Sequence, residues 1–220
     1  MFALQFISSE IFPLKKSDDA ESALIFLSDW MVKQLPVVEN MKVLGFVTDI
    51  TLLENEGKKV EELMQLNVDD YCISEHMHVF EIWQKLSANQ FNSLAVINNE
   101  GMFKGIISSQ DIALNSFSNS SLKQEGSILV LEVQAIQYSL AEIARICESN
   151  DAKVIHLMIE SLKDENNTLH VSLKLNKLFL SPVIASLERF GYRVVFTNSA
   201  SDVNQSLDDR FQWLVKYLNT

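Results

Sequence analysis

The feature that most constrains this chain is a short pattern that occurs twice, at residues 45–51 and at residues 105–111. Each copy has a glycine, a short apolar run, a hydroxyl residue and then the polar start of a helix. A hydroxyl at the end of a strand can cap the next helix, and a carboxylate in the first turn lies near its positive end. The second copy therefore predicts that Ser108 and Asp111 lie together at one helix N-terminus.

This pair of polar groups has two interpretations. Helix capping alone explains both residues and needs no ligand. Alternatively, Asp111 accepts hydrogen bonds from the vicinal hydroxyls of a ribose, and Ser108 donates or accepts a further one. The motif alone favours capping, so the choice depends on the rest of the repeat.

The similarity between the two copies extends well beyond the motif. Residues 35–38 align with residues 94–97, and one additional residue within 98–101 accounts for the only shift in register. At the same offset, earlier apolar positions also align: Leu14 with Ile73, Ala20 with Val79, Ala23 with Ile82 and Leu27 with Leu86. The sequence therefore predicts two β-α-β-β-α repeats up to about residue 120.

The first helix of the first repeat is predicted to begin at Asp18 as N-cap, with Glu21 completing a capping box. Leu27 and Met31 are predicted on the apolar face of that helix, and Trp83 on the buried face of the corresponding helix in the second repeat.

The paired repeat resembles a tandem pair of CBS domains, often called a Bateman module. The resemblance rests on the Leu-Pro-Val-Val strand and on the motif of glycine, two apolar residues, Thr or Ser, two further residues and Asp. It implies that the hydroxyl and aspartate of the last motif hold the ribose of an adenosine-type ligand, AMP or another adenosine derivative. Thr51 stands where the first motif would have its aspartate, which implies one ribose site, in the second repeat. The ligand-binding residues predicted on this basis are Ser108, Asp111, Ile73, Ser93, Leu94 and Thr48.

A Ser- and Asn-rich stretch at 116–126 predicts a domain boundary, after which the pattern changes. Strands are predicted near residues 127–133, 153–159, 168–175 and 192–196. One helix is predicted around residues 140–147, and another has Ser181 as N-cap, Pro182 at its first position and Gly191 at its end. The resulting β-α-β-β-α-β order is the ferredoxin-like plan.

Residues 139–146 and 187–195 resemble an ACT domain, a family that commonly binds amino acids beside a glycine in the first strand-to-helix turn. Here Gln137 and Tyr138 occupy that turn. A CBS pair followed by an ACT-like domain resembles the bacterial acetoin-utilisation regulatory proteins.

The predicted fold class is therefore α+β, with a CBS-domain pair followed by a ferredoxin-like domain of ACT type and a terminal helix. The predicted boundaries are residues 1–66 and 67–122 for the repeats, 126–200 for the ACT-like domain and 201–220 for an amphipathic helix. The apolar stripe of that helix covers an open sheet face or binds a partner, and the first alternative is favoured. The stripe consists of Leu207, Phe211, Leu214, Val215 and Leu218.

Charge and composition restrict the classes of partner. The formal net charge is −11, and the first 122 residues contain eight lysines, no arginine and seventeen acidic residues. Such a chain is a poor nucleic-acid binder and a weak site for a triphosphate, for which Lys42 and Lys104 are the candidate contacts. No signal peptide or membrane span is expected, and two cysteines in different halves do not indicate a disulfide framework. We expect a cytoplasmic location.

No metal or catalytic site is predicted. Cys72, His76 and His78 do not have the spacing of a structural zinc site, although the resemblance places His76 at the edge of an adenine pocket. Walker, nucleophile-elbow, zinc-protease and dinucleotide motifs are absent from the sequence. The leading hypothesis is a homodimeric, non-catalytic regulator that senses an adenosine-type ligand through domain or dimer rearrangement and acts on an unidentified protein target. The alternatives are a structural interaction module with a decayed nucleotide site and, less favoured, an enzyme that uses the cleft between the repeats.

Overall fold

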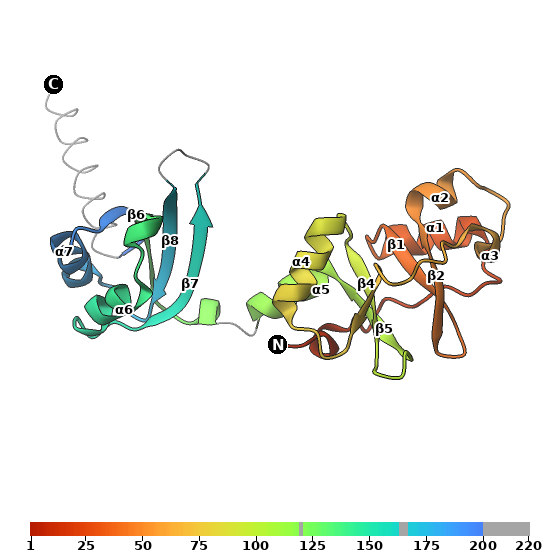
Figure 1. Ribbon diagram of the computed structural model, residues 1–220, viewed down its shortest axis with the longest axis horizontal. Helices are drawn as coiled ribbons and strands as arrows, with labels where there is room; N and C mark the ends of the chain where they lie inside the picture. The colour runs from red at the N-terminus through yellow and green to blue at the C-terminus, as the bar shows by residue number, and fades with distance from the viewer. Residues whose placement is uncertain (119–120, 163–166, 200–220) are drawn as a thin grey trace, which may run out of the picture. The chain divides into compact units, whose positions relative to one another are not determined.

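The computed structural model describes residues 1–118, 121–162 and 167–199 (Figure 1). The chain divides into two compact units, Met1–Ser118 and Asn119–Thr220. The amphipathic helix predicted over 201–220 lies outside the described residues. Within the described ranges, no helix is both long and apolar enough to cross a bilayer.

The first unit contains the predicted repeat. After the short 3-10 helix η1 (Ala3–Phe6), the first copy has α1 (Ala20–Asp29), β1 (Gln34–Glu39), β2 (Lys42–Thr48) and α2 (Asp49–Leu53), followed by α3 (Val60–Leu63). The second copy has β3 (Cys72–Ser74), α4 (Val79–Asn89), β4 (Ser93–Ile97), β5 (Phe103–Ser108) and α5 (Ser109–Ser118). The first strand of the first copy is reduced to a parallel bridge from Leu14 to Val37, at the position that pairs Ile73 with Val96 in the second copy.

The two hairpins have the same register. Gln34 pairs with Thr48 in the first, as Ser93 pairs with Ser108 in the second. Each motif glycine pairs with a residue of the preceding strand, as Gly105 pairs with Val96 in the second copy. In both hairpins the register shifts directly after that partner residue. The two copies predicted from apolar spacing therefore share both their strand pairing and the place of this register shift.

Each hairpin receives the segment that precedes the other repeat. The Phe46 amide donates to the Gln65 carbonyl at 3.0 Å, and the Gln65 amide donates back at 2.7 Å. In the second copy, the Ser8 amide donates to the Ile106 carbonyl at 2.8 Å. A Cβ atom on Gly45 would lie 2.5 Å from the Gln65 oxygen, and one on Gly105 would overlap Ile7. The motif glycines are therefore required because another segment packs directly against them.

Helix α1 begins one residue later than predicted. Asp19 caps it by accepting from the Ser22 amide at 2.8 Å, whereas Asp18 accepts from the Lys15 amide in the preceding turn. The predicted capping box between Asp18 and Glu21 is therefore wrong, and the Glu21 carboxylate accepts from the Gly57 amide instead.

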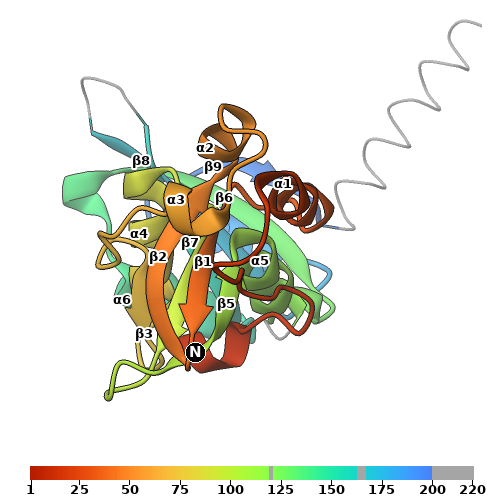
Figure 2. The ribbon, with the colours of Figure 1, turned by 90° about the vertical axis from the view of Figure 1, so that its right-hand side faces the viewer.

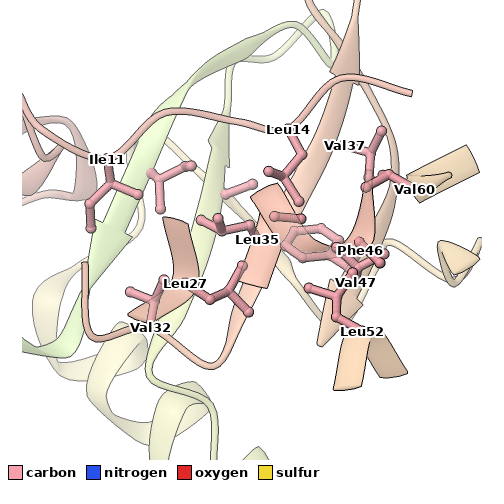
Figure 3. Packing of buried hydrophobic residues seen from close by; sticks show 14 of the residues in the cluster. Ile11, Leu14, Leu27, Val32, Leu35, Val37, Phe46, Val47, Leu52 and Val60 are labelled. Atoms are coloured by element: carbon pink, nitrogen blue, oxygen red, sulfur yellow. The ribbon is translucent and has the colours of Figure 1, made fainter. Parts of the chain in front are cut away.

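Most predicted core positions of the first unit are buried, but Met31 and Trp83 are not. Figure 3 shows the cluster around β1 and β2, in which Leu27, Leu35 and Phe46 are buried. Met31 was predicted on the same face as Leu27 but is 69% exposed, because the chain leaves α1 and Met31 has a φ of 52°. Trp83 is also exposed, at 38%. Burying a large apolar side chain contributes about 1.5 to 3 kcal/mol, so these clusters hold the unit together.

The second unit has the predicted β-α-β-β-α-β order, preceded by η2 (Ser121–Lys123). Its elements are β6 (Ser127–Gln134), η3 (Ala135–Gln137), α6 (Leu140–Glu148), β7 (Val154–Ser161), β8 (Thr168–Leu175), α7 (Ser181–Arg189) and β9 (Arg193–Thr197). The strands form an antiparallel sheet in the order β7-β8-β6-β9. All four strands are labelled in Figure 2. Apolar residues of α6 and α7 pack on the inner face of that sheet. Helix α7 includes Ser181, so its N-cap is Leu180, which makes no side-chain cap bond, and the predicted Ser181 cap is wrong.

Candidate functional site

A cavity of about 290 Å³ lies in the first unit where three segments meet. These segments are residues 8–11 before the first repeat, the end of α1, and the junction of β5 with α5. The lining residues are Ser8, Ser9, Glu10, Ile11, Asp29, Trp30, Met31, Ser108, Gln110, Asp111 and Leu114. The cavity therefore combines the motif of the second repeat with the end of α1 and the segment that precedes the first repeat.

Ser108 and Asp111 form a reciprocal cap on α5. The Ser108 hydroxyl donates to Asp111 Oδ2 at 2.6 Å and accepts from the Asp111 amide at 3.0 Å. The Ser108 amide also donates to Oδ2, at 3.3 Å. No hydrogen bond to Asp111 Oδ1 occurs within the described part of the chain. One carboxylate oxygen thus serves the cap, and the other can accept from a ligand.

The first repeat has the same backbone arrangement with a different chemistry. The Thr48 hydroxyl accepts from the Thr51 amide at 3.3 Å, and the two threonine hydroxyls lie 2.9 Å apart. Thr51 replaces the carboxylate, so this cap has no charged acceptor. The structure therefore places the predicted Thr48 at a helix cap and not in the lining of the cavity beside Asp111.

An aromatic side chain forms part of the cavity wall. Trp30 lines the cavity and stacks on Phe26, with ring centroids 5.4 Å apart and planes inclined by 18°. Phe12 contacts the same indole at 6.0 Å. Such a supported ring suits the flat face of a purine base.

The lining is acidic. It contains the carboxylates of Glu10, Asp29 and Asp111 and no basic side chain. Lys42 and Lys104, the predicted phosphate contacts, do not line it. Phosphate recognition usually relies on Arg or Lys, so this surface lacks the ordinary means of holding one.

The remaining predicted ligand residues lie elsewhere. Ile73 and Leu94 are buried in the core cluster of the second repeat. Ser93 is 1% exposed, and its hydroxyl donates to the Gln34 carbonyl at 2.6 Å while the Gln34 side chain donates to the Ser93 carbonyl at 2.8 Å. This exchange joins β1 to β4 across the two repeats. Of the six predicted residues, Ser108 and Asp111 are the ones that line the cavity.

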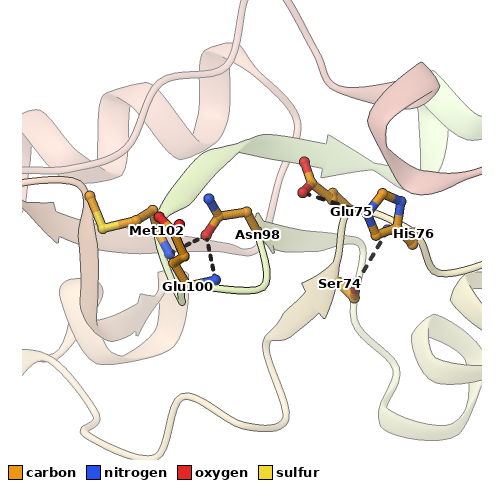
Figure 4. Close-up of polar contacts among 6 residues, drawn as sticks. All are labelled: Ser74, Glu75, His76, Asn98, Glu100 and Met102. Carbon is orange, nitrogen blue, oxygen red and sulfur yellow. Dashed lines mark hydrogen bonds and ion pairs between the residues drawn. The ribbon is translucent and has the colours of Figure 1, made fainter.

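His76 lies at the other end of the second hairpin. Figure 4 shows it beside Ser74 and Glu75, close to the turn in which the Asn98 side chain accepts from two backbone amides. Ser74 pairs with Ile97, whereas Ser108 pairs with Ser93 at the opposite end of β4. His76 therefore does not line the cavity beside Asp111, and its place at the edge of an adenine pocket stays a prediction.

Two of the residues considered as zinc ligands have features that do not suit metal binding. His78 caps α4 by accepting from the Phe80 amide at 3.3 Å. Burial raises the pKa of the Cys72 thiol to about 11, which disfavours the thiolate that metals bind. Among the described residues, no group of three His, Cys, Asp or Glu side chains is placed to hold a metal ion.

The second unit has a cavity of its own, of about 270 Å³. It is lined by Glu132, Val133, Gln137, Glu142, Phe190, Gly191 and Tyr192. The Tyr192 hydroxyl donates to Glu142 at 2.8 Å. Burial, together with this hydrogen bond and the charge of Glu142, raises the pKa of Tyr192 to about 12.

Comparison with known proteins decides the family. The CBS domain model matches residues 4–57 and 60–116, which together make up just over half of the chain. The chain belongs to the CBS domain family. Its tandem CBS pair coincides with the repeat seen in the sequence and in the first unit.

An inosine-5'-monophosphate dehydrogenase of Methanocaldococcus jannaschii is 25% identical over 128 residues, which are 56% of this CBS protein and 25% of the enzyme. The chain spans 25% to 48% of the length of the curated relatives that it matches. Among solved structures, a CBS domain pair/ACT domain protein from Thermotoga maritima is 18% identical with a TM-score of 0.45, covering 54% of this chain and 98% of that one. CBSX2 in complex with AMP is 20% identical with a TM-score of 0.46, covering 53% and 96%.

Sequence reasoning missed most of the cavity wall. Trp30 follows the predicted helix, and residues 8–11 precede the repeat, so neither lies within the motif. One signal was available: a glycine required by close packing indicates that another segment crosses there. The sequence does not say that this segment is Ile7 and Ser8.

Proposed function

We propose that this CBS protein is a non-catalytic regulator whose second repeat binds an adenosine-type ligand. The observation that carries the proposal is the Asp111 carboxylate at the cavity wall, with Oδ2 committed to the helix cap and Oδ1 open to a ligand. A ribose presents two vicinal hydroxyls, both of which can donate to a carboxylate. Trp30 supplies an aromatic face for the base.

Binding would connect segments that are far apart in the sequence. The cavity wall includes residues 8–11, the end of α1 and the start of α5. A ligand held by Asp111 and Trp30 would stabilise one arrangement of these segments. The shift in the conformational equilibrium would equal the ligand's difference in binding free energy between that arrangement and the others. On this physical basis we propose that the ligand regulates the protein through domain or dimer rearrangement, and that a target protein recognises the rearranged state.

We propose that the protein acts as a homodimer. Several helices of the first unit expose large apolar side chains, and symmetric self-association is the commonest way to cover such a surface. These residues are Ile25, Ile50, Leu53, Phe80 and Leu114.

We propose that the second unit is an ACT-like domain and that the whole chain resembles acetoin-utilisation regulators. Support comes from the β-α-β-β-α-β order, the antiparallel sheet and the helices packed on its inner face. The cavity beside Tyr192 and Glu142 lies near the strand-to-helix turn that contains Gln137.

The test is calorimetric titration of adenosine into the native protein and into Asp111→Ala. Charge-assisted hydrogen bonds contribute about 1.5 to 3 kcal/mol each, so affinity should fall at least tenfold. Ser108→Ala should cost less, because its hydroxyl is already committed to the cap. Asp49→Ala is the matched control, since it removes a carboxylate from the corresponding helix start of the first repeat. Light scattering on the same samples measures the mass with and without ligand. Equal affinity in the native protein and Asp111→Ala would refute the ribose assignment, and a monomer in both states would refute the dimer.

A second candidate is a structural interaction module in which Asp111 is only a cap. The three hydrogen bonds between Ser108 and Asp111 favour it, because they account for both side chains without a ligand. In that case Asp111→Ala would lower the melting temperature, and adenosine would stabilise neither protein.

A further inference from the structure

We propose that the cavity selects adenosine-type ligands without a phosphate group, and favours those with a positive charge where a nucleotide carries its phosphate. This inference rests on the proposed function and adds the charge class of the ligand. It follows from four features of the cavity: its carboxylates, the helix ends that face it, its lack of basic side chains, and its size.

Two carboxylates lie in the wall apart from the ribose contact. Glu10 belongs to the segment before the first repeat, and Asp29 is the last residue of α1. Both side chains are exposed, so their charges are not buried against partners. No ion pair to either residue occurs among the described residues. A phosphate brought to this wall would meet two like charges and no counter-charge.

The end of α1 adds to this negative potential. The C-terminal end of a helix carries a partial negative charge, at which cations are favoured and carboxylates are not. α1 has no basic residue in its last turn, and Asp29 occupies its final position. Asp29 therefore does not stabilise α1, because its negative charge lies at the negative end of the helix. Its side chain lines the cavity instead. A cationic group bound there would be favoured by both the side chain and the helix end.

The cavity also lacks the elements that usually capture phosphate. No lysine or arginine lines it, and the first 122 residues contain no arginine. The nearest lysine along the sequence, Lys33, is exposed and lines a different hollow together with Asp49. The positive end of α5 does reach the cavity, but the Asp111 carboxylate already accepts from the Ser108 amide there. An anion at that helix end would compete with Asp111.

Size points in the same direction. Ligand pockets are typically about 300 to 1,000 Å³, and this cavity of about 290 Å³ lies at the lower limit. A nucleoside with a small 5′ substituent suits that volume better than a triphosphate does.

The experiment measures the affinity of the full chain for four probes: adenosine, AMP, ATP and 5′-amino-5′-deoxyadenosine. These share the base and the ribose hydroxyls and differ in charge at the 5′ position. We expect the amine to bind most tightly, then adenosine, with AMP at least tenfold weaker than adenosine and ATP weaker again. Raising the salt concentration should reduce the differences in affinity among the four probes, because salt screens exposed charges.

Two double variants locate the cause. Glu10→Gln with Asp29→Asn removes the two wall charges and should raise the affinity for AMP relative to that for adenosine about tenfold. Glu56→Gln with Glu100→Gln removes the same number of negative charges at exposed positions outside the cavity lining, and should leave the order of the four affinities unchanged. Melting temperatures of all proteins check that each variant is folded.

The outcomes separate this inference from the proposed function. AMP or ATP binding as tightly as adenosine would overturn the charge selection and leave the adenosine site standing. If the difference between AMP and adenosine affinity became smaller by the same amount in both double variants, the effect would be due to overall charge, and the role of the cavity wall would be overturned. Absence of binding by all four probes would overturn the proposed function, and this inference would fall with it.

Discussion

Replacing Gly105 by alanine tests the packing that brings the first residues of the chain to the ligand cavity. The new Cβ would overlap Ile7 Cγ2, with Ile7 Cδ1 at 3.3 Å and Cβ at 3.5 Å. Ile7 can relieve the overlap only by moving, and it is followed directly by Ser8, whose amide donates to Ile106 at 2.8 Å. Gly105→Ala therefore pushes the first segment away from β5.

The expected loss follows from the contacts involved. Overpacking in a closed site typically costs about 1 to 3 kcal/mol, and Gly105→Ala should fall in this range. Gly45→Ala should cost more, roughly 2 to 5 kcal/mol, because its Cβ meets the Gln65 carbonyl oxygen at 2.5 Å. That oxygen is held by the Phe46 amide, so two backbone hydrogen bonds are weakened as well.

A double-mutant cycle with Ile7→Ala identifies the contact. Ile7→Ala removes Cγ2 and Cδ1, so alanine at position 105 should cost about 1 kcal/mol less in the Ile7→Ala background. No such rescue exists for Gly45→Ala, since a backbone atom is in the way. Urea unfolding, followed by fluorescence in a Trp213→Phe background, would report on Trp30 and Trp83 of the first unit. Additive losses at positions 7 and 105 would refute the packing argument.

Two further predictions concern buried polar groups. Ser93→Ala should destabilise the first unit by about 1 to 3 kcal/mol, because the Gln34 carbonyl loses its 2.6 Å donor, and a loss of adenosine affinity without a loss of stability would contradict this role. Burial and Glu142 raise the pKa of Tyr192 from an ordinary value near 10 to about 12 in the folded state, so the stability contributed by its neutral hydroxyl is complete below pH 10 and lost as the pH rises to 12. Urea unfolding across this range should show a larger loss of unfolding free energy for the native protein than for Tyr192→Phe, and parallel losses would contradict this role.

Much of the fold was accessible from the sequence because it depends on local pattern. Equal apolar spacing in the two copies predicted the repeat, and the structure gives both hairpins the same register and the same irregularity. Alternation over 168–175 predicted a strand with the bounds of β8, and Gly191, at a φ of 87°, follows α7 as expected. Helix starts were less accurate, since Asp18 and Asp19 are both good caps and tertiary contacts decide between them.

The site could be predicted only in part, because its wall is assembled from distant segments. Ser108 and Asp111 belong to one motif, and local capping geometry brings them together. Ser8 and Trp30 reach them through the crossing of the first segment onto β5 and the exit of the chain from α1. Ser93 was assigned to the ligand on the resemblance to CBS pairs, yet its hydroxyl donates to the Gln34 carbonyl between the repeats. The spacing of residues within one repeat cannot predict which residues of the other repeat will contact it.

The two repeats share a backbone and differ in the group that closes each cap, and this difference bears on how a ligand could act. In the first repeat both partners are hydroxyls, so Thr48 and Thr51 satisfy one another as neutral groups. In the second repeat, Asp111 brings a charge to the wall of a cavity, and the cap uses one of its two oxygens. A ligand that donates to Oδ1 would compensate this charge without breaking the cap, and would at the same time contact segments of the first repeat. Binding energy would then favour the arrangement of the two repeats seen in the structure over any arrangement that lacks these contacts, which is the differential affinity that a regulatory site requires.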